Sequence, residues 1–392
     1  MTIEISIADQ QALDKLAAAN PIWIGQGSAA ELTGLPDHIL LHAGPKFATP
    51  KQITAPILNS ARVAAVYQGL SDTFDEARQQ ILAGEITLLP AQDYGLATPL
   101  ASVVSMSMPL HIVCDREQQD TRGYAPINGG NGPAMRLGKC GDEVLAHLKW
   151  LNGDFARQLE AALNEPVGLL DIARTSLEQG DDCHGRTIEA TRVLREMLDC
   201  KLNNGAREFL QNGPSFFLNL WMAAVKCMFR QAEGVKGSSL VTSAGANGSE
   251  TGIQVSGLPG QWFTAKADPP KGDLDVDVDP SRKLGAIGDS ALVDALGLGA
   301  MAMNFAPAQK AGLGKHMPKE GLALPEKLLG IVHPGFGDLA VRVGTLASAV
   351  IREKQEPVVS LGVLDNQGEI GRVGGGIFVQ PAEIFRNAVS AM

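Results

Sequence analysis

The sequence predicts a multidomain α/β and α+β protein with an N-terminal Rossmann-like layer, a central helical region and a C-terminal mixed α+β domain. Three observations carry this prediction. Short apolar runs alternate with helix signals in the first third, helical spacing dominates the middle, and strand-like segments broken by glycines follow Ser238. Because 392 residues are too many for one compact core, we place domains at 1–125, 126–236 and 237–392.

The first third contains three predicted strands and two predicted helices in alternation. The strands are HILLHAGP, RVAAVYQG and EITLLPAQD, and the helices are TPKQITAPILNSA and SDTFDEARQQILAG. Short connections between alternating strands and helices favour a parallel sheet. Ligands bind beyond the carboxyl ends of parallel strands, where His42, Gly44 and Lys46 would lie.

The middle of the chain is predicted to be helical from about residue 143 to 234. The segment PSFFLNLWMAAVKCMFRQAEG has a wide apolar face, with Asn219, Lys226 and Arg230 on the opposite side. That polar stripe either meets solvent or faces a polar cleft. Further on, SSLVTSAG, TGIQVSG and QWFTAKA are predicted strands, and GDSALVDALGLGAMAM is a predicted helix with Asp289 or Ser290 as its N-cap.

Composition excludes several classes of function. The net charge is −10 with no long basic run, which argues against nucleic acid and anionic membrane surfaces. The longest apolar stretch, 291–306, is broken by Asp294, so we expect a buried helix rather than a membrane span. The cysteines form no CxxC pair and the N-terminus lacks a signal-peptide pattern, which favours a cytoplasmic location.

The stretch QGDDCHGRTIEATRVLREML, residues 179–198, joins a polar cluster to an amphipathic helix. Either Asp181 or Asp182 is well placed to cap the helix. Capping does not explain His184 and Arg186, because a guanidinium at a buried helix end needs an anionic partner. An active-site edge that binds an anion accounts for both residues. Metal ligation by Asp, Cys and His is the alternative, although the spacing differs from that of known structural sites.

Other segments are candidates for binding anions. A glycine-rich loop at 127–143 surrounds Arg136 and contains Asn128 and Asn131; its alternative role is a domain-linking loop. The segment Gly288–Ser290 precedes a predicted helix, and a helix N-terminus attracts anions. IGRVGGG near the C-terminus is similar to a phosphate loop but lacks its Lys-Ser/Thr pair.

Eight segments in the same order resemble the YlbE/AllG family, which includes a subunit of oxamate carbamoyltransferase. They are LLHAGP, SMSMP, NGGNGPAMRLGKCGDEVL, GDDCHGR, FFLNLWMA, VSGLPGQWFTA, GDSALVDALGLGAMAM and IGRVGGG. The resemblance implies a transferase that interconverts oxalurate plus phosphate with oxamate plus carbamoyl phosphate, working beside an FdrA-like and other subunits in an oligomer. One departure is GVLDNQGE, which places Asp365 where the family has His. A related ureido or carbamoyl substrate is therefore a second possibility.

Spacing and resemblance together assign roles to the candidate residues. We expect His184 to be the general acid/base, oriented by Asp181 or Asp182, and Arg186 to bind phosphate or carboxylate. We expect a small anionic substrate, no cofactor and no bound metal. The rival functions are a non-catalytic scaffold subunit and a metal-dependent amidohydrolase that uses the Asp/His cluster with the acidic run 273–279. The remaining substrate- or anion-binding candidates are His42, Gly44, Asn128, Arg136, Asn219, Gly288, Asp289 and Ser290.

Overall fold

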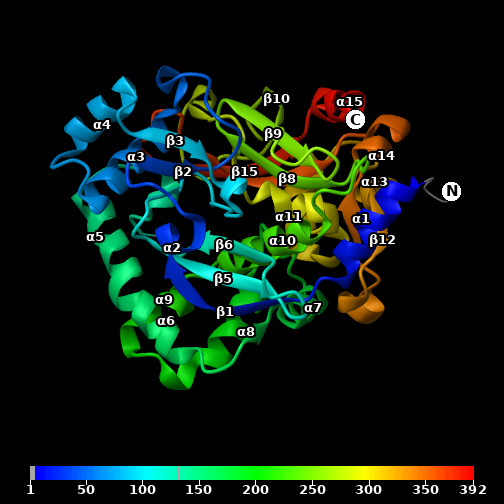
Figure 1. Cartoon of the computed structure of the whole chain (residues 1–392), viewed down its shortest axis with the longest axis horizontal. Helices are drawn as coiled ribbons and strands as arrows, with labels where there is room; N and C mark the ends of the chain where they lie inside the picture. Colours follow the sequence, from blue (N-terminus) through cyan, green and yellow to red (C-terminus); the bar gives the residue numbers. More distant parts are fainter. Residues whose placement is uncertain (1–4, 131) are drawn as a thin grey trace.

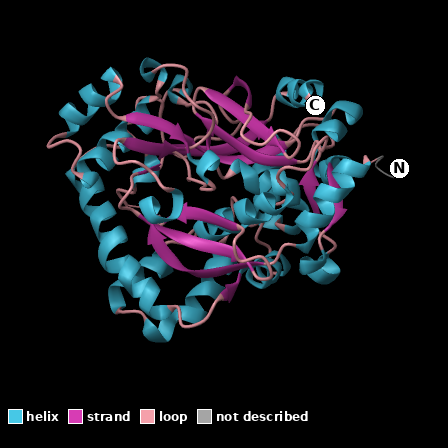
Figure 2. Cartoon of the chain, in the orientation of Figure 1, coloured by secondary structure: helices cyan, strands magenta, loops and turns pink. Residues whose placement is uncertain are grey.

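Two antiparallel sheets form the two sides of the molecule in the computed structural model, which describes residues 5–130 and 132–392. The first has the order β6-β5-β1-β7 and the second the order β10-β9-β8-β11. Figure 1 shows α10 and α11 between them, and Figure 2 shows the same arrangement by element type. The strands are β1 (Pro21–Ser28), β5 (Pro109–Asp115), β6 (Arg122–Pro126), β7 (Val167–Gly168), β8 (Val241–Asn247), β9 (Glu250–Val255), β10 (Phe263–Lys266) and β11 (Ile287–Gly288).

The Rossmann-like layer at the N-terminus is not confirmed. β2 (Ile39–His42) and β3 (Thr87–Pro90) pair in parallel, but β4 (Val103–Val104) joins β2 in the antiparallel direction. The strand predicted over 62–69 is wrong, because these residues complete α3 (Ala55–Gln68), which precedes α4 (Phe74–Ala83). Its alanines and valines bury one helical face, and Gly69 ends the helix in the left-handed conformation with φ 77°.

The helical prediction for the middle of the chain is confirmed. The loop 181–186 lies between α7 and α8, and α10 follows two short helices later. The elements are α5 (Asp142–Trp150), a π-helical turn at Leu151–Phe155, α6 (Ala156–Ala162), α7 (Leu169–Glu178), α8 (Ile188–Leu198), α9 (Asn204–Asn212) and α10 (Phe217–Ala232).

Helix α10 is buried almost throughout, and two of the three residues of its polar stripe are buried with it. Asn219 and Lys226 are 3% and 2% exposed, whereas Arg230 remains exposed. The Lys226 ammonium donates to Glu233 Oε1 at 3.1 Å and to Ser243 Oγ at 2.9 Å. Asn219 and Lys226 therefore contact polar groups of the protein, and only Arg230 meets solvent as the first alternative predicted.

The C-terminal part confirms the three strands predicted between 238 and 267. It then adds two hairpins, β12–β13 and β14–β15, and several short helices. The remaining elements of the chain are α1 (Ile7–Ala18), α2 (Ala29–Thr33), α11 (Ala291–Leu296), α12 (Pro307–Leu313), α13 (Leu324–Leu328), β12 (Leu329–Val332), β13 (Arg342–Thr345), α14 (Ala347–Glu353), β14 (Val358–Leu364), β15 (Arg372–Val379) and α15 (Ala382–Ala391), together with several 3-10 turns.

The largest core cluster contains side chains from all three predicted segments, among them Leu13, Trp221 and Phe385. A second cluster fills the space around α3 and β2 and includes Leu40 and Ala64. The division into three domains remains a prediction. No helix within the described residues is long and apolar enough to cross a membrane.

Candidate active site

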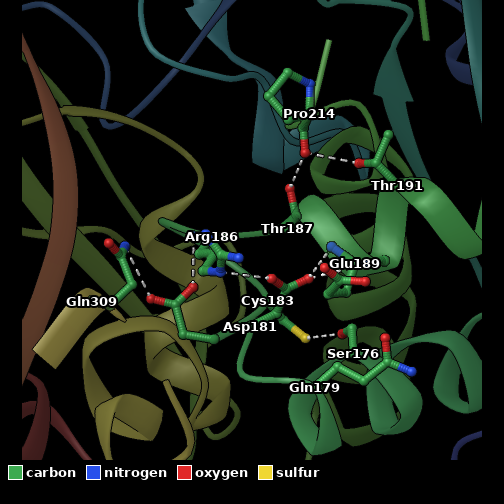
Figure 3. A network of polar contacts seen from close by, with 12 residues as sticks. Ser176, Gln179, Asp181, Cys183, Arg186, Thr187, Glu189, Thr191, Pro214 and Gln309 are labelled. Atoms are coloured by element: carbon green, nitrogen blue, oxygen red, sulfur yellow. Dashed lines mark hydrogen bonds and ion pairs between the residues drawn. The ribbon is translucent and has the colours of Figure 1, made fainter. Parts of the chain in front are cut away.

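Asp181 caps helix α8 from a position seven residues before the first residue of the helix. Its Oδ2 accepts hydrogen bonds from the main-chain N–H groups of Glu189 at 2.9 Å and Ala190 at 3.0 Å (Figure 3). The Nε of Arg186 lies 3.3 Å from the other oxygen. Burial raises the pKa of the Asp181 carboxyl to about 6. The predicted cap is confirmed for Asp181, and the anionic partner that Arg186 needs is this carboxylate.

Asp182 stabilises its own loop by accepting main-chain hydrogen bonds, and it does not contact the imidazole of His184 through a hydrogen bond. Its Oδ1 accepts the main-chain N–H groups of His184 and Arg186, both at 2.8 Å. Its Oδ2 lies 3.3 Å from Nε2 of Gln309, and its carbonyl accepts the N–H of Gly299 at 2.8 Å. Both buried acids of the cluster are therefore engaged with groups other than the His184 ring.

The ring of His184 is held by Asp294, which comes from helix α11. His184 Nδ1 and Asp294 Oδ2 are 2.5 Å apart, and Ser360 Oγ lies 3.5 Å from the same nitrogen. The other Asp294 oxygen accepts the N–H groups of Ala300 at 2.7 Å and Ser360 at 3.2 Å. Nε2 of His184 has no hydrogen-bond partner within residues 5–130 and 132–392.

The charge of Asp294 sets the protonation of His184. Burial alone would lower the pKa of the imidazole, but the neighbouring carboxylates of Asp294 and Asp182 outweigh burial and raise it. A histidine anchored through Nδ1 by a carboxylate presents Nε2 in a defined direction. This arrangement can accept a proton at Nε2 and return it to a bound molecule.

Gly299 makes the close approach of these two side chains possible. Its φ is +60°, a conformation that favours glycine. A Cβ at this position would lie 2.4 Å from Asp294 Oδ1 and 2.9 Å from His184 Cβ. Sequence reasoning missed Asp294 as a site residue, although a single acid inside an otherwise apolar run was visible.

Asp289 forms a second, separate cluster. Its carboxylate accepts hydrogen bonds from Gly44 N–H at 2.9 Å, Gln92 Nε2 at 2.7 Å, and both the N–H and the hydroxyl of Thr98 at 3.0 and 3.1 Å. Burial raises its pKa to about 6. The predicted cap of α11 is absent. Neither the side chain of Asp289 nor that of Ser290, the residue at the N-cap position, accepts a capping hydrogen bond from α11. Gly44 and Asp289 thus join two parts of the chain.

The other residues near β2 and β11 also make internal contacts. His42 Nδ1 lies 2.7 Å from the Ala43 carbonyl oxygen, and its ring packs against Phe47 with centroids 4.8 Å apart. Burial lowers the pKa of His42 to about 4, so the ring is neutral near pH 7. Lys46 is exposed. A Cβ on Gly288 would lie 2.9 Å from the Leu100 nitrogen, which places this turn against Leu100.

The third group contains Asn128, Arg136 and Asn219, and it brings the glycine-rich loop against the start of α10. Asn219 Nδ2 donates to the Asn128 carbonyl at 2.5 Å. Both terminal nitrogens of Arg136 donate to the Gly130 carbonyl, at 3.1 and 3.0 Å. Burial, together with the positive charge of Arg372, lowers the pKa of Arg136 to about 10. Asn131 lies outside the described residues.

Asp365, at the position where the resemblance implies His, is buried and accepts hydrogen bonds from Nε and Nη2 of Arg282 at 2.6 and 2.7 Å. It also accepts hydrogen bonds from the N–H groups of Glu369 and Ile370, so it stabilises the β14–β15 turn.

Among the described residues, no group of three or more His, Cys, Asp or Glu side chains is arranged to hold a metal ion.

The family model described as oxamate carbamoyltransferase subunit AllG matches residues 86–290, and the chain belongs to this family. The chain is 26% identical to the oxamate carbamoyltransferase subunit AllG of Escherichia coli K12, over 100% of this chain and 98% of that protein. It is 29% identical to the uncharacterized protein YahG of the same organism, over 98% of this chain and 85% of YahG.

A crystal structure of a conserved protein of unknown function from Enterococcus faecalis V583 shares the fold. Its TM-score is 0.92 and its sequence identity 24%, with 98% of this chain and 96% of that chain covered. The matched segment 86–290 includes the loop with His184 and ends before Asp294. The resemblance found in the sequence is thereby confirmed at the level of the family.

Proposed function

We propose that the chain is a carbamoyltransferase-type enzyme subunit that moves a carbamoyl group between phosphate and a small amide such as oxamate. The observation that carries the proposal is the buried His184–Asp294 pair, in which no described residue forms a hydrogen bond with Nε2 of His184. The name of the AllG relative supports the reaction class and a role within a complex. We also propose that the partners include an FdrA-like subunit.

The reaction requires two proton transfers, one away from the attacking phosphate and one to the departing amide nitrogen. When a hydrogen phosphate oxygen attacks the carbamoyl carbon of oxalurate, the C–O bond forms and the C–N bond to oxamate breaks. The phosphate hydroxyl loses a proton, and the departing amide nitrogen gains one. Nε2 of His184 takes the first proton and delivers the second, while Asp294 stabilises the imidazolium between the two steps. A neutral leaving amide is formed and no covalent enzyme intermediate is required.

The proposal is tested with the conservative variants His184→Gln and Asp294→Asn in the assembled complex. Because a positioned acid/base contributes roughly 10²–10⁴-fold to rate, both variants should lower kcat by about 10² or more, measured by phosphorus NMR of carbamoyl phosphate formation. The matched control is His38→Gln, since the side chain of His38 is 59% exposed. The control should retain native kcat.

Assembly and folding are measured on the same samples by gel filtration and circular dichroism. Native kcat in both variants, with assembly intact, would exclude His184 as the acid/base. Loss of assembly with native kcat in the remaining complex would favour the scaffold role instead. A change of the pH–rate profile in Asp294→Asn separates proton handling from a structural role.

A further inference from the structure

A polar cavity of about 350 Å³ opens between α2, the 3-10 turn Ala91–Tyr94, β6 and the C-terminal half of α10. This volume lies at the lower end of the range of small-molecule sites. The His184–Asp294 pair is not part of the lining. The charged residues of the lining are Asp93, Asp120, Lys226, Arg230 and Glu233.

Arg230 brings an unpaired positive charge to this cavity. Its guanidinium lies against the backbone of Gly95, where a Cβ would be 2.7 Å from Nη1 and 3.3 Å from Cζ. Gly95 also has φ +73°, so both the turn and this close approach favour glycine. Nη1 donates to the Arg122 carbonyl at 2.7 Å, and no carboxylate within the described residues forms an ion pair with Arg230. The remaining N–H groups can therefore bind an anion.

Tyr124 adds a neutral donor to the lining. The residue is 6% exposed, and its hydroxyl has no hydrogen-bond partner in the part of the chain that the structure describes. The hydroxyl oxygen is not sealed from solvent, so it is accessible from the cavity that Tyr124 lines. A buried tyrosine usually pairs its hydroxyl with another polar group. This hydroxyl is therefore available to a ligand.

Asp93 presents a carboxylate whose orientation is fixed by two side chains. Its Oδ1 accepts hydrogen bonds from Gln254 Nε2 at 2.7 Å and from Trp262 Nε1 at 2.9 Å. Within residues 5–130 and 132–392, Oδ2 has no hydrogen-bond partner, and no lysine or arginine pairs with this carboxylate. Oδ2 can therefore accept N–H groups from a bound molecule.

The buried part of the lining is held by contacts within the protein. The ammonium of Lys226, which is 2% exposed, is neutralised by Glu233 Oε1 at 3.1 Å. Gln92 is 3% exposed, and its Nε2 donates to Asp289 Oδ1 at 2.7 Å and to the Ala244 carbonyl at 2.9 Å. Side chains that are already ordered lose little entropy when a ligand binds.

The charges of the lining select the type of ligand. Because Lys226 and Glu233 neutralise each other, the remaining charges are those of Arg230, Asp93 and Asp120. Two carboxylates repel a dianionic phosphate, whereas a single carboxylate can pair with the arginine. The N–H groups of an amide or ureido group are complementary to the free oxygen of Asp93.

We propose that this cavity binds a small carboxylic acid that carries an amide or ureido group. Arg230 and the Tyr124 hydroxyl bind the carboxylate, and Asp93 Oδ2 accepts the N–H groups at the other end. Oxamate is a compound of this class, and its choice as the probe rests on the function proposed above. The site itself does not depend on the acid/base role of His184.

Equilibrium binding to the full-length chain tests the site without turnover. Oxamate and pyruvate are titrated separately by calorimetry, because pyruvate has nearly the same shape but carries a methyl group in place of the NH₂ group. The native protein should bind oxamate about tenfold or more tightly than pyruvate, since pyruvate cannot donate to Asp93. Arg230→Gln should weaken the binding of both acids about tenfold or more. Asp93→Asn should weaken the binding of oxamate alone.

Two further variants complete the experiment. Tyr124→Phe removes only the hydroxyl and should weaken the binding of both acids about threefold or more. Arg78→Gln changes an exposed arginine on α4 and is the matched control, so it should keep the native Kd for both acids. We expect an unchanged Tm for Arg230→Gln and Arg78→Gln, because both side chains are exposed.

Three results would overturn the site: a native protein that binds neither acid, equal native Kd values for oxamate and pyruvate, or native Kd values in both Arg230→Gln and Asp93→Asn. Loss of oxamate binding in His184→Gln but not in Arg230→Gln would place oxamate at the candidate active site and also reject the cavity. Weakened binding in Arg230→Gln together with native kcat in His184→Gln would instead retain the cavity and reject the acid/base role.

Discussion

At the scale of single residues, the partner of each side chain decides what that side chain does. Asp181 and Asp182 are neighbours in sequence, yet one caps a helix and the other ties its own loop together. The ring of His184 forms a hydrogen bond with neither of them and meets Asp294, 110 residues further along the chain. The acidity and spacing of the cluster predicted a cap and a polar edge. The prediction that Asp181 or Asp182 orients the imidazole was wrong, because Asp294 is the carboxylate that reaches it.

Gly299→Ala tests whether the histidine pair depends on its glycine. Alanine at φ +60° is strained, and its Cβ would overlap Asp294 Oδ1. We expect the free energy of unfolding to fall by about 2 kcal/mol or more, with a loss of activity. The control Gly312→Ala lies in helix α12 with open space around its Cβ and should unfold like the native protein. An unchanged urea midpoint for Gly299→Ala would show that the pair tolerates a methyl group.

At the scale of elements, helix α8 obtains its cap from outside the usual position. The hydroxyl of Thr187, which precedes the helix, makes no capping bond and instead donates to the Pro214 carbonyl at 3.2 Å. Asp181 supplies the acceptor because the tight loop 182–186 returns the chain to its side. The apolar spacing from Ala190 onward determines the helix, whereas the loop determines its cap.

Asp181→Ala should therefore destabilise the protein more than an ordinary helix acid would. The variant leaves two N–H groups of α8 and the Arg186 guanidinium without their acceptor, for an expected loss of about 2 kcal/mol or more. The control is Asp171→Ala in the first turn of α7, where the carboxylate is 76% exposed. Its loss should stay within about 0.5 kcal/mol. Equal urea midpoints for the two variants would contradict the capping role.

At the scale of the whole molecule, buried titratable groups give the protein opposing responses to acid. His42 and His111 are fully buried, and burial lowers their pKa values to about 4 and about 3. The unfolded chain takes up these protons near pH 6.5, so the unfolded state binds more protons below that pH. The contribution of these histidines to the free energy of unfolding therefore falls as the pH decreases from about 6.5 toward 4. Asp181 and Asp289 act in the opposite sense, because their raised pKa values mean that the folded state binds protons first.

His111→Leu isolates one of these contributions. The ring lies between Trp23 and Phe216, with centroids 5.5 and 5.9 Å away, and neither of its nitrogens has a partner within the described residues. Between pH 7 and pH 5 the variant should lose about 2 kcal/mol less stability than the native protein, measured by urea unfolding at both values. Because Asp181 and Asp289 are present in both His111→Leu and the native protein, their contribution cancels in the difference between the two. An equal loss of stability between pH 7 and pH 5 in His111→Leu and the native protein would contradict a neutral His111.

Local patterns in the sequence determined the helical middle, the strands between 238 and 267, the family and the polar cluster of 181–186. Such patterns succeed because periodic burial and main-chain capping act over a few residues. The tertiary structure alone decided that residues 62–69 continue α3, that Asp294 meets His184, and that Asp181 is the anionic partner of Arg186. Each of these depends on contacts between distant segments, and a short apolar run or a lone charge carries no information about its distant partner.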